Sequence, residues 1–176
     1  MQSRTTHHQR VLAIDLRPQQ FGYAIFEGEQ LLDWGACYFR PGGAIGAASA
    51  GKRVAKLVKA FLPSVIVVKK VGRKMTLNSP GVEPILKAIR REANACSIPV
   101  SLIARNEVRE AFREFRCTNK YEIASMLASM HPELLWKLPP ERKFYESEHP
   151  SMTTFDAVAL GYTFWHRSTT ELPPPN

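Results

Sequence analysis

Apolar positions predict three strands at the start of the chain. The segments 10–16 and 20–27 are almost wholly apolar, and "LLDWGACYF", 31–39, is a third run rich in large apolar side chains. Pro18 and Gly28 lie in the short breaks between these runs, and such breaks are typical of hairpins. We therefore expect three consecutive antiparallel strands.

The pattern then alternates between helix and strand. Apolar residues at helical spacing predict helices over 47–61 and 82–96, and "SVIVV", 64–68, is a continuous β-branched run typical of a strand covered on both faces. "IPVSLIA", 98–104, is the next strand. Asn106 and Thr118 are the expected N-caps of two further helices. A proline-punctuated bridge leads to a last amphipathic helix over 153–167.

This order of elements matches an α/β fold of the RNase H-like kind, with a central five-stranded mixed sheet flanked by helices. In that connectivity the first and fourth strands lie side by side in parallel, and one face of the last helix crosses the same sheet edge. Asp15 ends the first strand, and Asp156 lies in the last helix. We expect these two carboxylates to meet.

The length and ends of the chain indicate one domain. A chain of 176 residues can bury one sizeable core but is short for two. We expect a flexible N-terminus at 1–9, the domain at 10–167 and a disordered tail at 168–176. No apolar run approaches the ~20 residues of a membrane span, and the polar N-terminus does not resemble a signal peptide. We therefore expect no membrane partner and a cytoplasmic location.

The charge balance changes the functional picture. Lys and Arg outnumber Asp and Glu by 24 to 16, which gives a net charge of +8. Such an excess favours a polyanionic partner, although many mildly basic domains bind no nucleic acid. "VVKKVGRK" gathers Lys69, Lys70, Arg73 and Lys74 at the end of the fourth strand. We expect the last three of these to bind nucleic acid.

The motifs resemble those of RuvC-type Holliday-junction resolvases. "RVLAIDLRPQQFGYAIFE" is similar to the family's opening strand ending in Ile-Asp, and "PSVIVVKKV" to its fourth strand. "NKYEIASMLASMHPELLWKLP" is similar to a segment that usually reads Lys-x-x-Val-x-x-Met and ends in Leu-Pro. "FDAVALGYTFWH" is similar to the family's terminal helix. The resemblance runs in order from about Arg10 to His166.

The resemblance implies a magnesium or manganese site with four ligands, of which this chain supplies two. Asp15 and Asp156 match the first and last carboxylates, but Lys69 stands at the position of a glutamate and Thr153 at that of an acid or histidine. An ammonium in place of a carboxylate repels a metal ion by roughly several kcal/mol at intermediate dielectric. We expect metal binding to be weak or absent.

Lys69 and the bridge before the last helix each have alternatives. Lys69 either pairs with Asp15 and Asp156, in place of a metal, or binds phosphate directly. Glu146, Glu148 and His149 are either solvated loop residues, the more ordinary interpretation, or ligands that the bridge brings inward.

Two functions from different classes follow. One is a magnesium-dependent endonuclease whose catalytic group comprises Asp15, Asp156 and Lys69, acting on branched or duplex DNA as the homodimer that the resemblance implies. The alternative is a nucleic-acid-binding or scaffolding protein that has kept the fold and lost the two-metal site. A kinase- or actin-like function is weaker, because the glycine-rich phosphate loops are absent.

Overall fold

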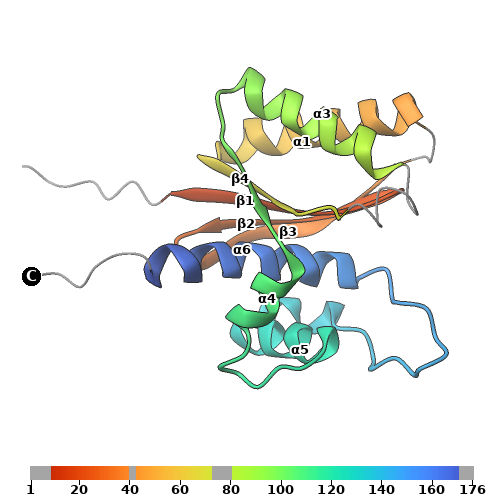
Figure 1. Ribbon diagram of the computed structural model, residues 1–176, viewed down its shortest axis with the longest axis vertical. Helices are drawn as coiled ribbons and strands as arrows, with labels where there is room; N and C mark the ends of the chain where they lie inside the picture. Colours follow the sequence, from red (N-terminus) through yellow and green to blue (C-terminus); the bar gives the residue numbers. More distant parts are fainter. Residues whose placement is uncertain (1–8, 40–42, 73–80, 171–176) are drawn as a thin grey trace, which may run out of the picture.

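A five-stranded sheet with helices on both faces forms the centre of the protein (Figure 1). The structure is a computed structural model that describes residues 9–39, 43–72 and 81–170. The strands are β1 (Arg10–Arg17), β2 (Gln20–Glu27), β3 (Gln30–Tyr38), β4 (Val65–Lys69) and β5 (Val100–Ile103), in the spatial order β3-β2-β1-β4-β5. The first three are antiparallel, and β4 is parallel to both β1 and β5. The predicted sheet is confirmed.

The helices form two layers around this sheet. α1 (Gly43–Phe61) and α3 (Val82–Ala95) cover one face, and α6 (Met152–Thr170) crosses the other (Figure 1). α4 (Arg105–Ala111), α5 (Lys120–Met130) and the short 3-10 helix η1 (Pro132–Lys137) lie on the α6 side. No helix in the described part of the chain is long and apolar enough to cross a membrane.

The two-residue period of β1 and β4 divides the core between the layers. Val11 and Ala13 pack toward α6, while Leu12, Ile14 and Leu16 pack toward α1 and α3. β4 alternates in the same way, as expected for a strand covered on both faces. Continuing this alternation places Asp15 and Lys69 on the α6 face of neighbouring strands.

Two glycines allow α6 to lie close to β1 and β2. A Cβ on Gly22 would come within 1.9 Å of the Thr153 carbonyl oxygen, and one on Gly161 within 2.4 Å of the Phe26 ring. Neither position has room for a side chain. The start of α6 can therefore touch the strand next to Asp15.

Both expected N-caps were wrong by one or two residues. α4 begins after Ala104, whose backbone N–H donates to Glu107 Oε2 at 2.6 Å, so Asn106 lies inside the helix. α5 is capped by Asn119, whose Oδ1 accepts from the N–H of Glu122 at 2.9 Å. Thr118 precedes this cap. At α5 the neighbours Thr118 and Asn119 have similar capping ability, whereas the N-cap of α4 is Ala104, which has no capping side chain, and the side chain of Glu107 satisfies its N–H instead.

The expected terminal segments lie largely outside the described residues. Residues 1–8 and 171–176 belong to those segments and are not described, whereas α6 extends to Thr170.

Candidate functional site

Asp15 lies near the C-terminal end of β1, on the sheet face that α6 covers, and has no exposed surface. Its Oδ1 lies 3.1 Å from Lys69 Nζ, at the end of the parallel neighbour β4. Its Oδ2 accepts from Thr153 Oγ1 at 3.1 Å and lies 3.4 Å from Arg17 Nε. The expected contact between Lys69 and Asp15 is confirmed, and it explains how a buried carboxylate is tolerated.

Thr153 links the sheet to the start of α6. Its hydroxyl oxygen accepts from the Gly22 backbone N–H at 3.1 Å while the hydroxyl donates to Asp15. Because the residue is fully buried, these two hydrogen bonds satisfy a group that water cannot reach. Thr153 therefore orients Asp15, at the position where the resemblance implies a third metal ligand.

Asp156 joins the same group of side chains from α6. Its Oδ2 lies 2.8 Å from Lys120 Nζ and 3.0 Å from the Arg17 guanidinium. Arg17 thus contacts both aspartates. Asp15, Lys69 and Asp156 therefore converge on one group of side chains, as expected, and Lys69 makes its direct contact with Asp15.

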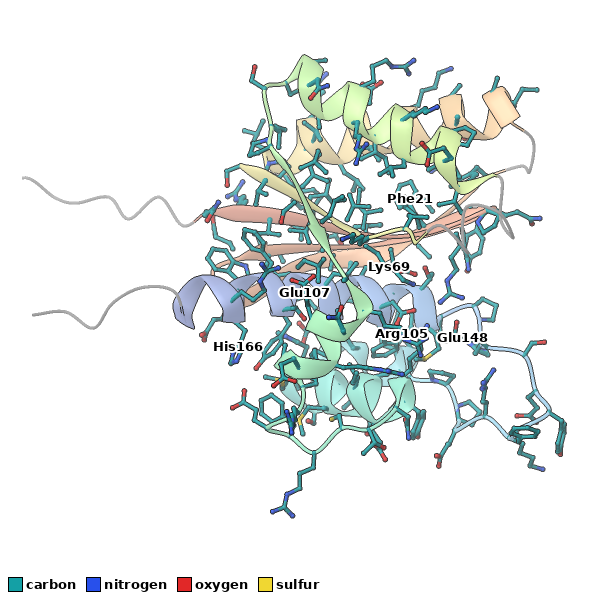
Figure 2. All side chains as sticks on the ribbon, in the orientation of Figure 1. Phe21, Lys69, Arg105, Glu107, Glu148 and His166 are labelled. Atoms are coloured by element: carbon teal, nitrogen blue, oxygen red, sulfur yellow. The ribbon has the colours of Figure 1, made fainter. Side chains whose placement is uncertain are left out.

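Glu148 is the third carboxylate. Its Oε1 lies 2.8 Å from Lys120 Nζ and its Oε2 lies 2.9 Å from Arg17. Figure 2 shows Lys69 at the level of the sheet and Glu148 near the first turn of α6, on the same side of the molecule. The solvated-loop interpretation is wrong for Glu148, but Glu146 is exposed, and His149 Nδ1 lies 2.7 Å from Ser151 Oγ.

The six side chains form a compact ion cluster, named here the charge cluster. It comprises three carboxylates and three cations: Asp15, Glu148, Asp156, Arg17, Lys69 and Lys120. Its formal charge is therefore zero at neutral pH. Each carboxylate has at least one cation within 3.1 Å.

The cluster shifts the pKa values of its members. Burial alone lowers the pKa of Lys120, but the charges of Asp156 and Glu148 outweigh it and raise the pKa overall. Burial raises the pKa of Asp156, and the like charge of Asp15 raises it further, against the opposing effect of Lys120. Burial also lowers the pKa of Arg17, but the charges of Asp15, Glu148 and Asp156 outweigh burial and raise this pKa overall. Lys120 and Arg17 therefore both stay protonated at neutral pH.

These residues do not fit a two-metal centre. Magnesium takes oxygen ligands, usually one or two carboxylates with water and phosphate. Here an ammonium occupies one oxygen of Asp15, and two cations hold the other two carboxylates. In the described part of the chain, no group of three or more His, Cys, Asp or Glu side chains is placed to hold a metal ion.

Five of the six residues of the charge cluster, all except Arg17, line a pocket of about 710 Å³. Basic side chains that follow β4, lie on α4 or precede α6 line the pocket as well: Lys70, Arg105, Arg109 and Arg142. Lys70, Arg105 and Arg109 are exposed and have no ion-pair partner among the described acidic side chains. Arg73 and Lys74, also expected to bind nucleic acid, lie outside the described residues.

Sequence reasoning missed Arg17 and Lys120. Arg17 follows Asp15 by two residues, so the period of a strand places both on one face. Lys120 is the lysine of the segment that resembles Lys-x-x-Val-x-x-Met. The strand period and the motif lysine could thus have pointed to these two residues. Their contacts, however, depend on how α5 packs against α6, and no local sequence pattern contains that packing.

Comparisons with known proteins agree with this architecture. No model of a known protein family matches the chain. No curated protein matches it either. Among solved structures, the chain is similar to Thermus thermophilus RuvC in complex with a Holliday junction substrate, with a TM-score of 0.70, 19% identity, and coverage of 93% of this chain and 97% of that chain. The chain has a RuvC-type fold.

A second structure supports the RuvC-type fold. The yeast mitochondrial Holliday junction resolvase Ydc2 matches with a TM-score of 0.61 and 15% identity, over 96% of this chain and 85% of that chain. A shared fold at such identities does not establish a shared activity, because activity depends on the site.

Proposed function

We propose that this protein binds branched or duplex DNA across the pocket without two-metal hydrolysis at the charge cluster. The observation that carries the proposal is the pairing of Asp15 with Lys69, at the point where the resemblance requires two carboxylates around a metal. An ammonium 3.1 Å from Asp15 supplies permanently the positive charge that a metal would bring.

The basic rim of the pocket supports DNA as the partner. Arg105 and Arg109 lie four residues apart on α4, so they share one face of that helix, and Lys70 follows β4 at the same pocket. Lysine and arginine bind phosphate oxygens through charge-assisted hydrogen bonds. The names of both similar structures refer to Holliday junctions, and a homodimer would match the two-fold symmetry of such a substrate.

The alternative is a metal-dependent junction endonuclease. The convergence of Glu148 with Asp15 and Asp156 favours it, because all three carboxylates contact Arg17, and Glu148 and Asp156 also contact Lys120. For this function, the ion pairs of Arg17 and Lys120 with the carboxylates would have to break before a metal ion could bind.

Lys69→Glu separates the two functions. Isothermal titration of the unmodified protein with magnesium and manganese should give little or no heat, whereas Lys69→Glu should bind at least one ion, because it adds a carboxylate beside Asp15 and removes the competing ammonium. Lys69→Met, which removes the charge without adding a ligand, is the matched control.

A junction-binding and cleavage assay completes the test. The unmodified protein should bind a four-way junction at low salt and leave it intact in magnesium. Rapid cleavage by the unmodified protein would establish the endonuclease instead, and absence of binding at low salt would rule out both functions.

A further inference from the structure

Two aromatic side chains project from the segment that joins η1 to α6. Phe144 is 102% exposed and Tyr145 is 77% exposed, more than any other large apolar side chains on the described part of this segment. In Figure 1 the segment leaves the body of the molecule as an open loop beside the start of α6. Exposed aromatic rings of this kind, outside any core, commonly mark binding surfaces.

The two rings occupy the tip of an ordered turn. The Glu146 N–H donates to the Lys143 carbonyl at 3.0 Å, and the Lys143 N–H donates to Glu146 Oε2 at 2.8 Å. Arg142 donates to the Glu146 carbonyl at 3.1 Å. These bonds close the turn from both sides. The rings are therefore held outward before any partner binds, which lowers the entropy cost of binding.

Both arms of the turn return to the DNA-binding pocket proposed above. Pro139, Pro140 and Arg142 line the pocket before the tip, and Glu148 lines it after the tip. Glu148 also fixes the second arm to Arg17 and Lys120 in the charge cluster. The aromatic tip thus stands beside a phosphate-binding surface.

The chemistry around the tip identifies the partner. Arg142 and Lys143 directly precede the rings, and the pocket beside them carries further arginines. Cations that lie beside exposed aromatic rings suit nucleic acid, because the cations contact phosphates while the rings stack on bases. Stacking needs a base that is free of its own neighbours, so paired duplex offers the rings little.

We infer that the Phe144–Tyr145 turn is a base-stacking element that receives unpaired or unstacked bases of DNA held in the pocket. The inference rests on the proposed DNA binding and adds to it a preference for branched or single-stranded structure over paired duplex.

The test compares Phe144→Ala/Tyr145→Ala with the unmodified protein on two substrates of the same arm sequences, a four-way junction and a fully paired duplex. The double variant should bind the junction about tenfold more weakly or worse, because each lost base stack is worth roughly tenfold or more in affinity. Its affinity for the duplex should stay within about twofold of the unmodified protein, since phosphate contacts dominate there. Tyr38→Ala, on the edge strand β3 and outside the pocket, is the control and should change neither affinity.

A second variant reports stacking directly. Phe144→Trp should retain junction affinity and add tryptophan emission that the junction quenches more than the duplex does. Equal loss on both substrates, no loss on either, or dissociation of a dimer by the double variant would overturn the stacking role. Absence of DNA binding by the unmodified protein would instead overturn the proposed function.

Discussion

At the residue scale, the charge cluster balances attraction against desolvation. Asp15 is fully buried, yet a cation, a hydroxyl and a guanidinium meet its two oxygens. Removing one member of such a group leaves its partners uncompensated, which costs more than the pair contributes by itself. Each residue of the cluster is therefore a sensitive position for stability as well as for binding.

Glu148 has the clearest pH dependence in the cluster. Burial raises its pKa, but the hydrogen bond and charge of Lys120, together with Arg17, outweigh burial and lower the pKa from its ordinary value of 4.5. A carboxyl whose pKa is lower in the folded protein adds stability above its unfolded pKa, and this stability is lost as pH falls through the folded-state pKa.

Glu148→Gln should therefore lower the free energy of unfolding by about 1–3 kcal/mol at pH 7, because charge-assisted hydrogen bonds to Arg17 and Lys120 are weakened. The difference from the unmodified protein should shrink as the pH falls below 4.5. Urea denaturation over a pH series measures both. Glu146→Gln is the control, since its amide oxygen still accepts from Lys143 and the residue is exposed. A difference that is constant with pH would contradict the assigned cause.

At the element scale, the site depends on how closely α6 approaches the sheet. Parallel pairing places the ends of β1 and β4 side by side, and the two-residue period points Asp15 and Lys69 to the same face. α6, which covers this face, then adds Thr153 and Asp156. Gly22 allows this close approach because it has no Cβ to clash with the backbone of Thr153, and its own backbone N–H donates to the Thr153 hydroxyl.

Gly22→Ala should destabilise the protein by about 3 kcal/mol or more, because its Cβ would lie 1.9 Å from the backbone oxygen of Thr153, which cannot rotate away. Gly51→Ala is the matched control. Its Cβ would meet neighbours at an ordinary 3.6 Å inside α1, so it should be neutral or stabilise by up to about 1 kcal/mol. Thermal unfolding of both variants checks the prediction, and equal melting temperatures would show that α6 does not need this close contact.

At the scale of the whole molecule, the net charge of +8 and the basic pocket rim act together. The charge cluster itself is neutral, so the positive field that would attract the proposed DNA partner comes from cations outside it, such as Lys70 and Arg109. Long-range attraction of this kind is screened by salt, with a Debye length of about 10 Å at 0.1 M.

DNA affinity should accordingly fall steeply with salt, with a log–log slope of about −0.9 for each phosphate contacted. Arg109→Ala should weaken binding and reduce the magnitude of this slope by about 1. Arg113→Ala, in a residue paired with Glu110 and absent from the pocket, should leave the slope unchanged. Fluorescence anisotropy with a labelled duplex and a labelled junction over a salt series measures the slopes, and salt-insensitive binding would contradict a phosphate-driven interface.

The sequence by itself determined the sheet and placed Asp15 and Lys69 at the ends of two neighbouring strands, while the contact of Lys69 with Asp15 was one of two alternatives. Runs of β-branched residues, short turns and the two-residue period are local properties, and the order of the elements then admits few topologies. The N-cap of α5 was misplaced because Thr118 and Asn119 have similar capping ability, and that of α4 because its N-cap position holds Ala104, which has no capping side chain.

Only the tertiary structure decided which cations complete the site. Lys120 reaches Asp156 across 36 positions of sequence, and Glu148 reaches Arg17 from a segment that looks like an ordinary solvated loop. No local pattern encodes these contacts, because they depend on the distance and angle at which α5 and α6 pack beneath the sheet. The charges were readable from the sequence, but their pairing, and with it the neutrality of the cluster, was set by packing.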